Sequence, residues 1–247
     1  MKKHILSFLA AAVLFLLIPL SFAGADYDSS SYWDSSANAY LYNTPHYGIV
    51  LCTKMSVRNK PSTSGTAYGT IRNGQPVKIL GVSQDGNFYL LDIASCSITT
   101  TKATRGFAKA SLIKKDPEFI QASRLLNLYA TPWGDGLKNG EQNNRFFLII
   151  SQNYNWYAVQ STESTPGSAF IRTGDVSPTY NHTKYVITWD AELRDENTMA
   201  TIRTVRRFTV GRLLKTSQKR SLLVFNEGTD SEYRGWVLTQ FTAPVIN

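Results

Sequence analysis

Short runs of alternating apolar and polar residues fill the chain after Tyr47. In one run Val77 and Ile79 alternate with Lys78. In another, Tyr89 and Leu91 alternate with Phe88, Leu90 and Asp92. This period of two predicts β-strands that bury one face. Gly, Pro, Asn and Asp separate the runs, as they do in turns between strands. Helical periodicity is confined to short segments, so we predict an all-β fold.

One order of strands and turns is repeated three times. The clearest copy has a first strand, a Pro/Ser/Gly-rich loop, a glycine turn, two β-rich strands and a glycine-led closing strand. The first strands contain Val57, Leu126 and Leu193. Units of about 60 residues bury only about 60% of their unfolded surface, so each gains stability by packing on its neighbours. We therefore expect short linkers and a compact rod.

The N-terminus has the layout of a secretory signal peptide. Lys2 and Lys3 precede an apolar run from Ile5 to Leu20, and Ala23-Gly24-Ala25 forms a cleavage site of small residues. The run is shorter than the roughly 20 residues of a membrane span, which disfavours the alternative of a retained anchor. We expect an exported protein, either secreted and extracellular or held in the cell envelope, with no stable membrane anchor.

Composition sets the remaining boundaries. The stretch after the signal peptide is rich in Ser, Asp, Asn and Tyr and has no strand or helix period, which predicts a flexible leader. Prolines at Asp116-Pro117 and Ser177-Pro178 limit the continuation of strands. The predicted segments are a signal peptide at 1–25, a flexible leader at 26–46, unit 1 at 47–117, unit 2 at 118–179 and unit 3 at 182–247.

The three copies carry motifs of a known family. The first opens with Val57-Arg58-Asn59-Lys60-Pro61-Ser62, the second contains Asn155-Trp156-Tyr157-Ala158-Val159, and the third closes with Gly235-Trp236-Val237. These motifs resemble the bacterial SH3 domain, a small β-barrel found in tandem on secreted and wall-associated bacterial proteins. The resemblance implies three tandem small SH3-like β-barrels, the third degenerate. It also implies binding of cell-wall peptide or another extracellular ligand.

Two cysteines, Cys52 and Cys96, both lie in unit 1. An even count in an exported chain favours a disulfide between them. In the barrel implied by the resemblance, Cys52 lies on the first strand and Cys96 follows a later strand, so the two could meet across the sheet. The alternative is a pair of free buried thiols.

The chain lacks most residue sets that hydrolases use. A cysteine nucleophile needs an activating histidine, and a zinc site needs three ligands, commonly including two or three histidines. Only the isolated His46 and His182 follow the signal peptide, so we predict no enzyme, no cofactor and no metal. A glycosidase needs only two carboxylates. Four acids between Asp190 and Glu196 therefore leave a cell-wall hydrolase as a weaker alternative, although a solvated loop with local Arg pairing explains them better.

Unit 3 contains the strongest charge feature of the chain. Seven bases and no acid lie between Arg203 and Arg220. The formal net charge is +8, and +6 without the two lysines of the signal peptide. Such a surface suits an anionic wall polymer, whereas nucleic acid is not expected as the partner of an exported protein. The candidate contacts are Arg203, Arg206, Arg207 and Arg212. The alternative is a solvated outer face on two strands.

Aromatic side chains are the other candidates for a binding site. SH3-like barrels bind extended peptides in aromatic-lined grooves. Trp156 and Tyr157 follow one another on a strand, so they must face opposite sides of the sheet. The candidates are Tyr129, Trp133, Trp156, Tyr157 and Tyr89. Packing within the barrel is the alternative for each.

These patterns together predict a secreted, non-catalytic binding protein. Its expected partner is cell-wall peptidoglycan or an anionic wall polymer. The main alternative is an extracellular protein–protein interaction or assembly module without wall affinity.

Overall fold

The computed structural model describes a chain built from β-strands. The described residues are 30–98, 101–122, 126–132, 137–142, 145–161, 168–176, 183–217 and 219–246. Over these ranges the strands are joined by turns and short 3-10 helices, with no α-helix, so the all-β prediction is confirmed. No helix in this part of the chain is long and apolar enough to cross a membrane. The predicted signal peptide lies outside the described residues.

Unit 1 and the segment before it form one eight-stranded sheet. Its strands are β1 (Tyr32–Asp34), β2 (Ala39–Val50), β3 (Lys54–Arg58), β4 (Ala67–Arg72), β5 (Pro76–Val82), β6 (Phe88–Asp92), β7 (Arg105–Lys109) and β8 (Ile113–Lys115). They pair in the order β1-β2-β5-β6-β7-β3-β4, and β8 pairs with β2. The 3-10 helices η1 (Ile93–Cys96) and η2 (Ala110–Leu112) connect neighbouring strands.

Units 2 and 3 share a thirteen-stranded sheet. The strands of unit 2 are β9 (Phe119–Gln121), β10 (Leu126–Tyr129), β11 (Leu137–Gln142), β12 (Phe146–Gln152), β13 (Trp156–Ser161) and β14 (Ser168–Arg172). Those of unit 3 are β15 (Lys184–Ile187), β16 (Ala191–Arg194), β17 (Thr201–Val205), β18 (Val210–Thr216), β19 (Arg220–Phe225), β20 (Tyr233–Leu238) and β21 (Thr242–Ile246). The 3-10 helix η3 (Thr173–Asp175) follows β14, and η4 (Thr239–Phe241) precedes β21.

Strand β21 connects the second and third units. Its first half pairs antiparallel with β15, with Pro244 opposite Tyr185, and its second half pairs parallel with β9, with Val245 opposite Phe119. Ile246 is consequently buried in the core of unit 2 rather than that of unit 3. We expected three separate closed barrels. The described strands instead pair along two open paths, and the last residues of β21 join units 2 and 3 in one of them.

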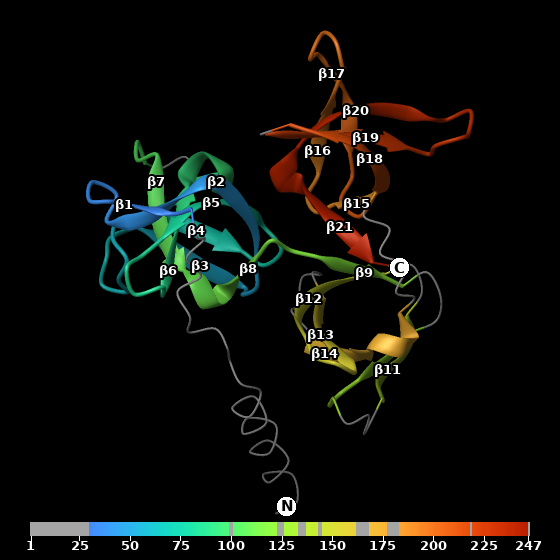
Figure 1. Ribbon diagram of the computed structural model, residues 1–247, viewed down its shortest axis with the longest axis horizontal. Coiled ribbons are helices and arrows are strands. Elements are labelled where there is room, and N and C mark those ends of the chain that lie inside the picture. Colours follow the sequence, from blue (N-terminus) through green and yellow to red (C-terminus); the bar gives the residue numbers. More distant parts are fainter. Residues whose placement is uncertain are drawn as a thin grey trace, which may run out of the picture.

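The described interior contains one hydrophobic core for each unit, a cluster between the leader and unit 1, and a further cluster shared by the three units. The shared cluster contains Ile49 of unit 1, Phe119 and Leu148 of unit 2, and Val186, Ala243 and Val245 of unit 3. All six are at most 3% exposed. The three units therefore surround a common centre (Figure 1), so the expectation of a rod is wrong.

Polar contacts also cross between units 1 and 2. The Gln160 side-chain amide donates to the Leu51 carbonyl oxygen at 2.8 Å, and Lys114 Nζ donates to the Ile150 carbonyl oxygen at 3.2 Å. Burial lowers the pKa of Lys114, because desolvation penalises its charged form. These contacts fix units 1 and 2 against one another.

The predicted flexible leader is folded where the structure describes it. Residues 32–34 form β1, and β2 begins at Ala39, well before the expected start of unit 1. Strand β2 can approach β5 because of Gly81, where a Cβ atom would collide with the Tyr40 carbonyl oxygen. The interpretation of this stretch as flexible is therefore corrected: its polar composition masked a few apolar residues, which pack on unit 1.

Candidate functional site on the outer sheet faces

Each unit brings two pairs of residues together across its sheet, and the pairs occupy equivalent places in the three units. One backbone pair joins β3, β10 or β16 to the strand before the last 3-10 helix of the unit: Arg58 with Phe107, Tyr129 with Phe170, and Arg194 with Trp236. A second pair lies beside it: Phe88 with Lys109, Trp156 with Arg172, and Arg220 with Leu238.

These four positions point away from the unit's own core. Side chains alternate along a strand, and the adjacent residues Val57, Leu128 and Leu193 are all buried in the three cores. We call the four positions of each unit its outer face. In unit 3 the two strands approach closely because of Gly235, where a Cβ atom would collide with the Arg194 carbonyl oxygen.

The outer face of unit 1 is partly covered by the chain itself. Ala39 and Leu41 of β2 pack on Leu90 and Phe107, and all four side chains are at most 8% exposed. Asp34 lies 3.7 Å from Arg105 at the edge of this cover, as an ion pair between the leader and β7. Of the other outer-face residues, Phe88 is half-buried against this cluster and Lys109 is exposed.

The outer face of unit 2 holds an arginine against two aromatic rings. Tyr129 and Trp156 meet edge to face, with ring centroids 5.2 Å apart and an interplanar angle of 82°. The Arg172 guanidinium lies 4.9 Å from the Tyr129 centroid and 5.4 Å from that of Trp156. Cation–π contacts of this kind are worth about 0.5–1 kcal/mol at exposed sites. The cluster is a preformed, partly exposed surface of aromatic and cationic groups.

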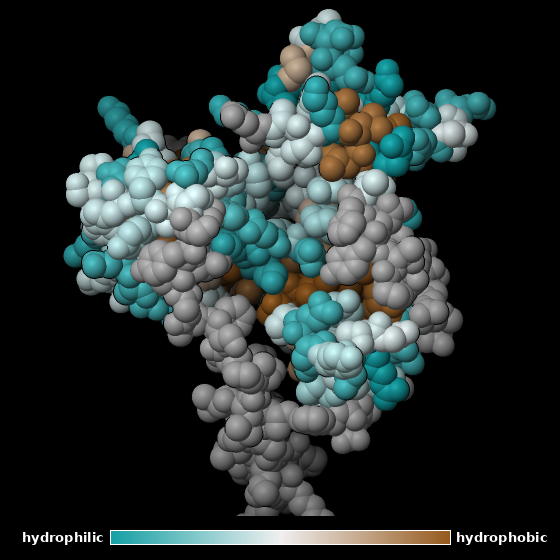
Figure 2. Space-filling view, viewed as in Figure 1, coloured by the Kyte–Doolittle hydropathy of each residue, from teal (hydrophilic) through white to brown (hydrophobic). Residues whose placement is uncertain are grey.

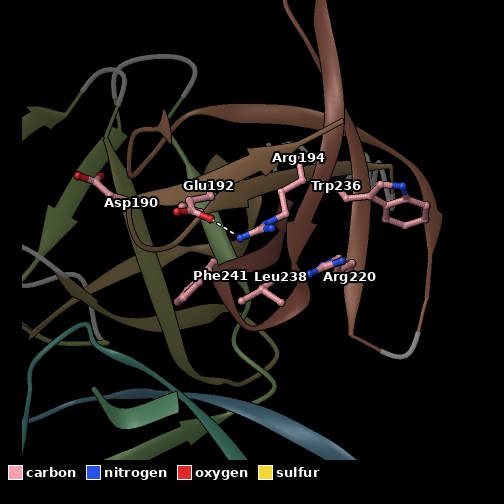
Figure 3. Close-up of a pocket in the computed structure, with 8 residues that line it drawn as sticks. Asp190, Glu192, Arg194, Arg220, Trp236, Leu238 and Phe241 are labelled. Atoms are coloured by element: carbon pink, nitrogen blue, oxygen red, sulfur yellow. Dashed lines mark hydrogen bonds and ion pairs between the residues drawn. The ribbon is translucent and has the colours of Figure 1, made fainter. Parts of the chain in front are cut away.

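The outer face of unit 3 is hollowed into a pocket of about 260 Å³. It is lined by Asp190, Ala191, Glu192, Arg194, Arg220, Trp236, Leu238 and Phe241. Figure 3 shows Asp190 and Trp236 at opposite ends, with Leu238 and Phe241 between them. Leu238, which is 38% exposed, and Phe241 give the pocket an apolar wall.

The charges in this pocket are only partly paired. Arg194 Nη2 donates to Glu192 Oε2 at 2.7 Å (Figure 3), and its Nη1 donates to the Met199 carbonyl oxygen at 3.3 Å. Arg220 Nη1 lies 3.8 Å from the Met199 sulfur, a weak acceptor. Among the described residues no carboxylate pairs with Arg220. The pocket thus offers a guanidinium, a carboxylate and apolar side chains together.

The aromatic residues proposed from the sequence are mostly buried. Tyr129 and Trp156 meet on the outer face of unit 2, where Trp156 is half-buried and Tyr129 is only 9% exposed. Tyr157 and Tyr89 are only 6% and 8% exposed and pack in the cores of units 2 and 1. Trp133 lies outside the described residues. Sequence reasoning correctly placed Trp156 and Tyr157 on opposite faces, because strand alternation alone decides this.

Sequence reasoning missed the residues that complete these faces. Arg172, Arg194, Arg220 and Trp236 were not among the candidates. Their signal is positional rather than chemical: each occupies the same place in its copy of the repeated pattern as an outer-face residue of another unit. Aligning the three copies by strand order would have grouped them.

The predicted basic stripe of unit 3 is spread over several environments. Arg203 lies 4.2 Å from the ring of Tyr233, and Arg207 lies 4.5 Å from that of Phe208. Arg212 pairs with Glu227, which raises the pKa of Arg212 and lowers that of Glu227. Arg206 is exposed. Glu227 lies outside the basic stretch in sequence, so the partial neutralisation was not visible there.

The predicted disulfide is absent, and both cysteines are free thiols. Cys96 is buried in η1, where its Sγ lies 3.4 Å from the Asp92 carbonyl oxygen of its own turn. Burial raises the pKa of the Cys96 thiol to about 12 and also raises that of Cys52. Neither sulfur has the lowered pKa of a nucleophilic cysteine.

The four acids between Asp190 and Glu196 all have structural partners. Glu192 pairs with Arg194, Glu196 Oε1 lies 2.6 Å from Arg234 Nε, and Asp190 accepts the Arg207 backbone N–H at 2.7 Å. Asp195 accepts hydrogen bonds from the turn that follows it, and these lower its pKa. Within the described ranges no three His, Cys, Asp or Glu side chains are grouped to hold a metal ion.

Comparison with known proteins identifies part of this architecture. No curated protein matches the chain. Two solved structures titled NlpC2 and NlpC1 from Trichomonas vaginalis align with 8% and 9% identity, covering 80% and 86% of this chain and 98% and 99% of theirs. Their TM-scores are 0.24 and 0.22, too low to support an argument. Residues 53–114, the central part of unit 1, match the family described as "Bacterial SH3 domain". This part of the chain is therefore a bacterial SH3 domain.

Proposed function

We propose that this protein is an exported, non-catalytic binding protein that recognises cell-wall peptidoglycan. The observation that carries the proposal is the contrast between the outer faces. That of the matched SH3 domain is partly covered by the leader and its phenylalanine Phe107 is buried, whereas those of units 2 and 3 present partly exposed arginine and tryptophan side chains. Trp, Tyr and Arg are the residues that contribute most to binding at protein interfaces.

The three units are proposed to be variants of one SH3-like design. In each unit one strand (β3, β10 or β16) pairs with the strand before a 3-10 helix through an equivalent pair of residues. Because the shared centre fixes the units against one another, the open faces of units 2 and 3 keep a constant separation. A polymeric ligand with repeating groups could then engage both faces at once, which raises the apparent affinity without new contacts.

The absence of catalysis is supported by the chemistry of the candidate groups. A cysteine nucleophile needs a lowered pKa, but the pKa values of Cys52 and Cys96 are raised. A glycosidase acid needs a raised pKa, but that of Asp195 is lowered. Export through the N-terminal signal peptide would bring the binding faces to the wall.

Sedimentation with insoluble purified peptidoglycan tests the proposal. The mature protein should enter the pellet, and the double variant Trp156→Ala, Trp236→Ala should stay in the supernatant. Trp33→Ala is the matched control, because Trp33 is also an exposed tryptophan, 41% accessible, but lies on β1 away from both faces. Retention of the wild-type protein in the supernatant at low and moderate salt would refute wall binding.

The same assay separates peptidoglycan from an anionic wall polymer. Walls stripped of their anionic polymers should bind the protein as well as intact walls. Charge reversal at the exposed Arg206, by Arg206→Glu, should have little effect. Binding that requires the anionic polymer and disappears in Arg206→Glu would contradict the assignment to peptidoglycan. Clearing of a wall suspension by the protein would contradict the proposal that it is not an enzyme.

A further inference from the structure

The pocket of unit 3 contains an arginine that the protein does not neutralise. Three other arginines of this unit pair with acids: Arg194 with Glu192, Arg212 with Glu227, and Arg234 with Glu196. Arg220 has no such partner among the described residues, and its guanidinium contacts only a thioether sulfur. A half-buried guanidinium in a pocket is a ready site for a planar anion, because its fork of N–H groups matches both oxygens of a carboxylate.

The rest of the pocket restricts which anion fits. Leu238 lies opposite Arg220 on the neighbouring strand, with Phe241 beyond it (Figure 3), and the two supply an apolar wall for a small side chain next to the anion. The carboxylates of Asp190 and Glu192 line the same pocket as the guanidinium groups of Arg194 and Arg220, so its formal charges balance. This balance disfavours phosphate, which carries more negative charge than a carboxylate, and favours a ligand with an N–H group beside its carboxylate.

The size of the pocket limits the ligand further. Its volume of about 260 Å³ is below the range of roughly 300–1,000 Å³ that is typical of sites for drug-sized ligands. It can therefore hold the end of a chain rather than an extended peptide. Capture of a peptide terminus is one of the recurring ways in which proteins recognise peptides.

We infer that the unit 3 pocket binds the free C-terminal carboxylate of a short peptide that ends in a small apolar residue. Arg220 binds the carboxylate, Leu238 and Phe241 contact the last side chain, and Glu192 accepts a hydrogen bond from a backbone N–H. The inference rests on the proposed function and specifies it: unit 3 selects peptide ends that are free rather than peptides that continue beyond the pocket.

Isothermal titration calorimetry with the mature protein tests this inference. The probe is acetyl-Gly-Ala-Ala with a free carboxylate, prepared with L- and with D-alanine, and the comparison ligand is the same peptide with a C-terminal amide. The acid should bind in at least one chiral form, and the amide about tenfold more weakly or not at all. Equal binding of acid and amide, or no saturable binding of either at millimolar concentration, would overturn the inference.

Arg220→Gln and Lys219→Gln form a matched pair of variants. Both remove one positive charge at adjacent positions, but Lys219 is exposed and does not line the pocket. Arg220→Gln should raise the dissociation constant about tenfold or more, Arg220→Lys should fall in between, and Lys219→Gln should resemble the wild type. Equal effects of Arg220→Gln and Lys219→Gln would show that Arg220 acts only through its contribution to net charge, and would overturn the inference. Thermal melts of the variants should match that of the wild type.

Peptidoglycan sedimentation of the same variants distinguishes a failure of the pocket assignment from a failure of wall binding. If Arg220→Gln still sediments with the wall like wild type and no peptide acid binds, the inference fails and wall binding stands. If the peptide acid binds through Arg220 but the wall does not retain the protein, the pocket assignment stands and the wall is the wrong source of the ligand.

Discussion

Phe146 of unit 2 and Phe208 of unit 3 stack face to face, with ring centroids 5.3 Å apart and an interplanar angle of 5°. Phe208 holds this position with a φ of 64°, in the left-handed region that bulky residues rarely adopt. Its backbone N–H donates to the Ile187 carbonyl oxygen at 2.7 Å. The turn is therefore held by this hydrogen bond within unit 3 and by the ring contact with unit 2. A strained conformation of this kind costs about 1–3 kcal/mol, which the contact between units must offset.

Replacement of Phe208 separates the packing from the strain. Phe208→Ala should lower the free energy of unfolding by about 2 kcal/mol, because the stacked ring and its half-buried surface are lost. Phe208→Gly loses the same contacts but relieves the left-handed strain, so it should be more stable than Phe208→Ala by about 1 kcal/mol. Urea denaturation measures both values. The exposed Leu214→Ala should stay within about 0.5 kcal/mol of wild type.

A Phe208→Gly variant less stable than Phe208→Ala would show that backbone strain at Phe208 is not relieved by glycine.

Gln160 should be the most sensitive polar residue between units 1 and 2. It is 7% exposed, and its amide donates to both the Leu51 carbonyl oxygen and Asn73 Oδ1. Gln160→Ala removes a buried donor and both of these hydrogen bonds, which should cost about 1–3 kcal/mol in the free energy of unfolding. The matched control is Gln152→Ala, at an exposed position of β12. Equal stability of the two variants would show that water replaces the amide.

Some of the architecture could be predicted from local sequence, and some could not. The period of two in residues such as Val77 and Ile79 determines which side chains enter a core, so the strands and the opposite orientation of Trp156 and Tyr157 were predictable. The pairing of β21 with β9 depends on contacts between residues more than 120 positions apart, such as Val245 and Phe119, and leaves no local signal. The neutralisation of Arg212 by Glu227 depends on a loop whose position only the fold determines.

The leader should be an integral part of unit 1. Leu41→Asp places a charge in the cluster with Leu90 and Phe107, so it should lower the free energy of unfolding by about 3 kcal/mol or more. It should also open the outer face, seen as increased binding of a dye for exposed apolar surface and faster cleavage within residues 30–45 by a nonspecific protease. The exposed Tyr32→Asp should change neither readout. An unchanged Leu41→Asp protein would restore the interpretation of this segment as a flexible leader.

The buried thiol of Cys96 should make stability depend on alkaline pH. Its pKa is about 12 in the folded protein against 9.0 for an exposed thiol, so the unfolded chain releases its proton first as the pH rises. The contribution of Cys96 to stability is therefore fully present below pH 9 and declines between about pH 9 and 12. Tyr47 and Tyr185 have raised pKa values and decline with pH in the same sense, so the informative quantity is the difference between wild type and Cys96→Ala. That difference should shrink as the pH rises through this range in urea titrations, and intact mass should not change on reduction. A difference that is constant with pH would show that Cys96 is not desolvated, and a mass increase on reduction would show that the thiols are oxidised.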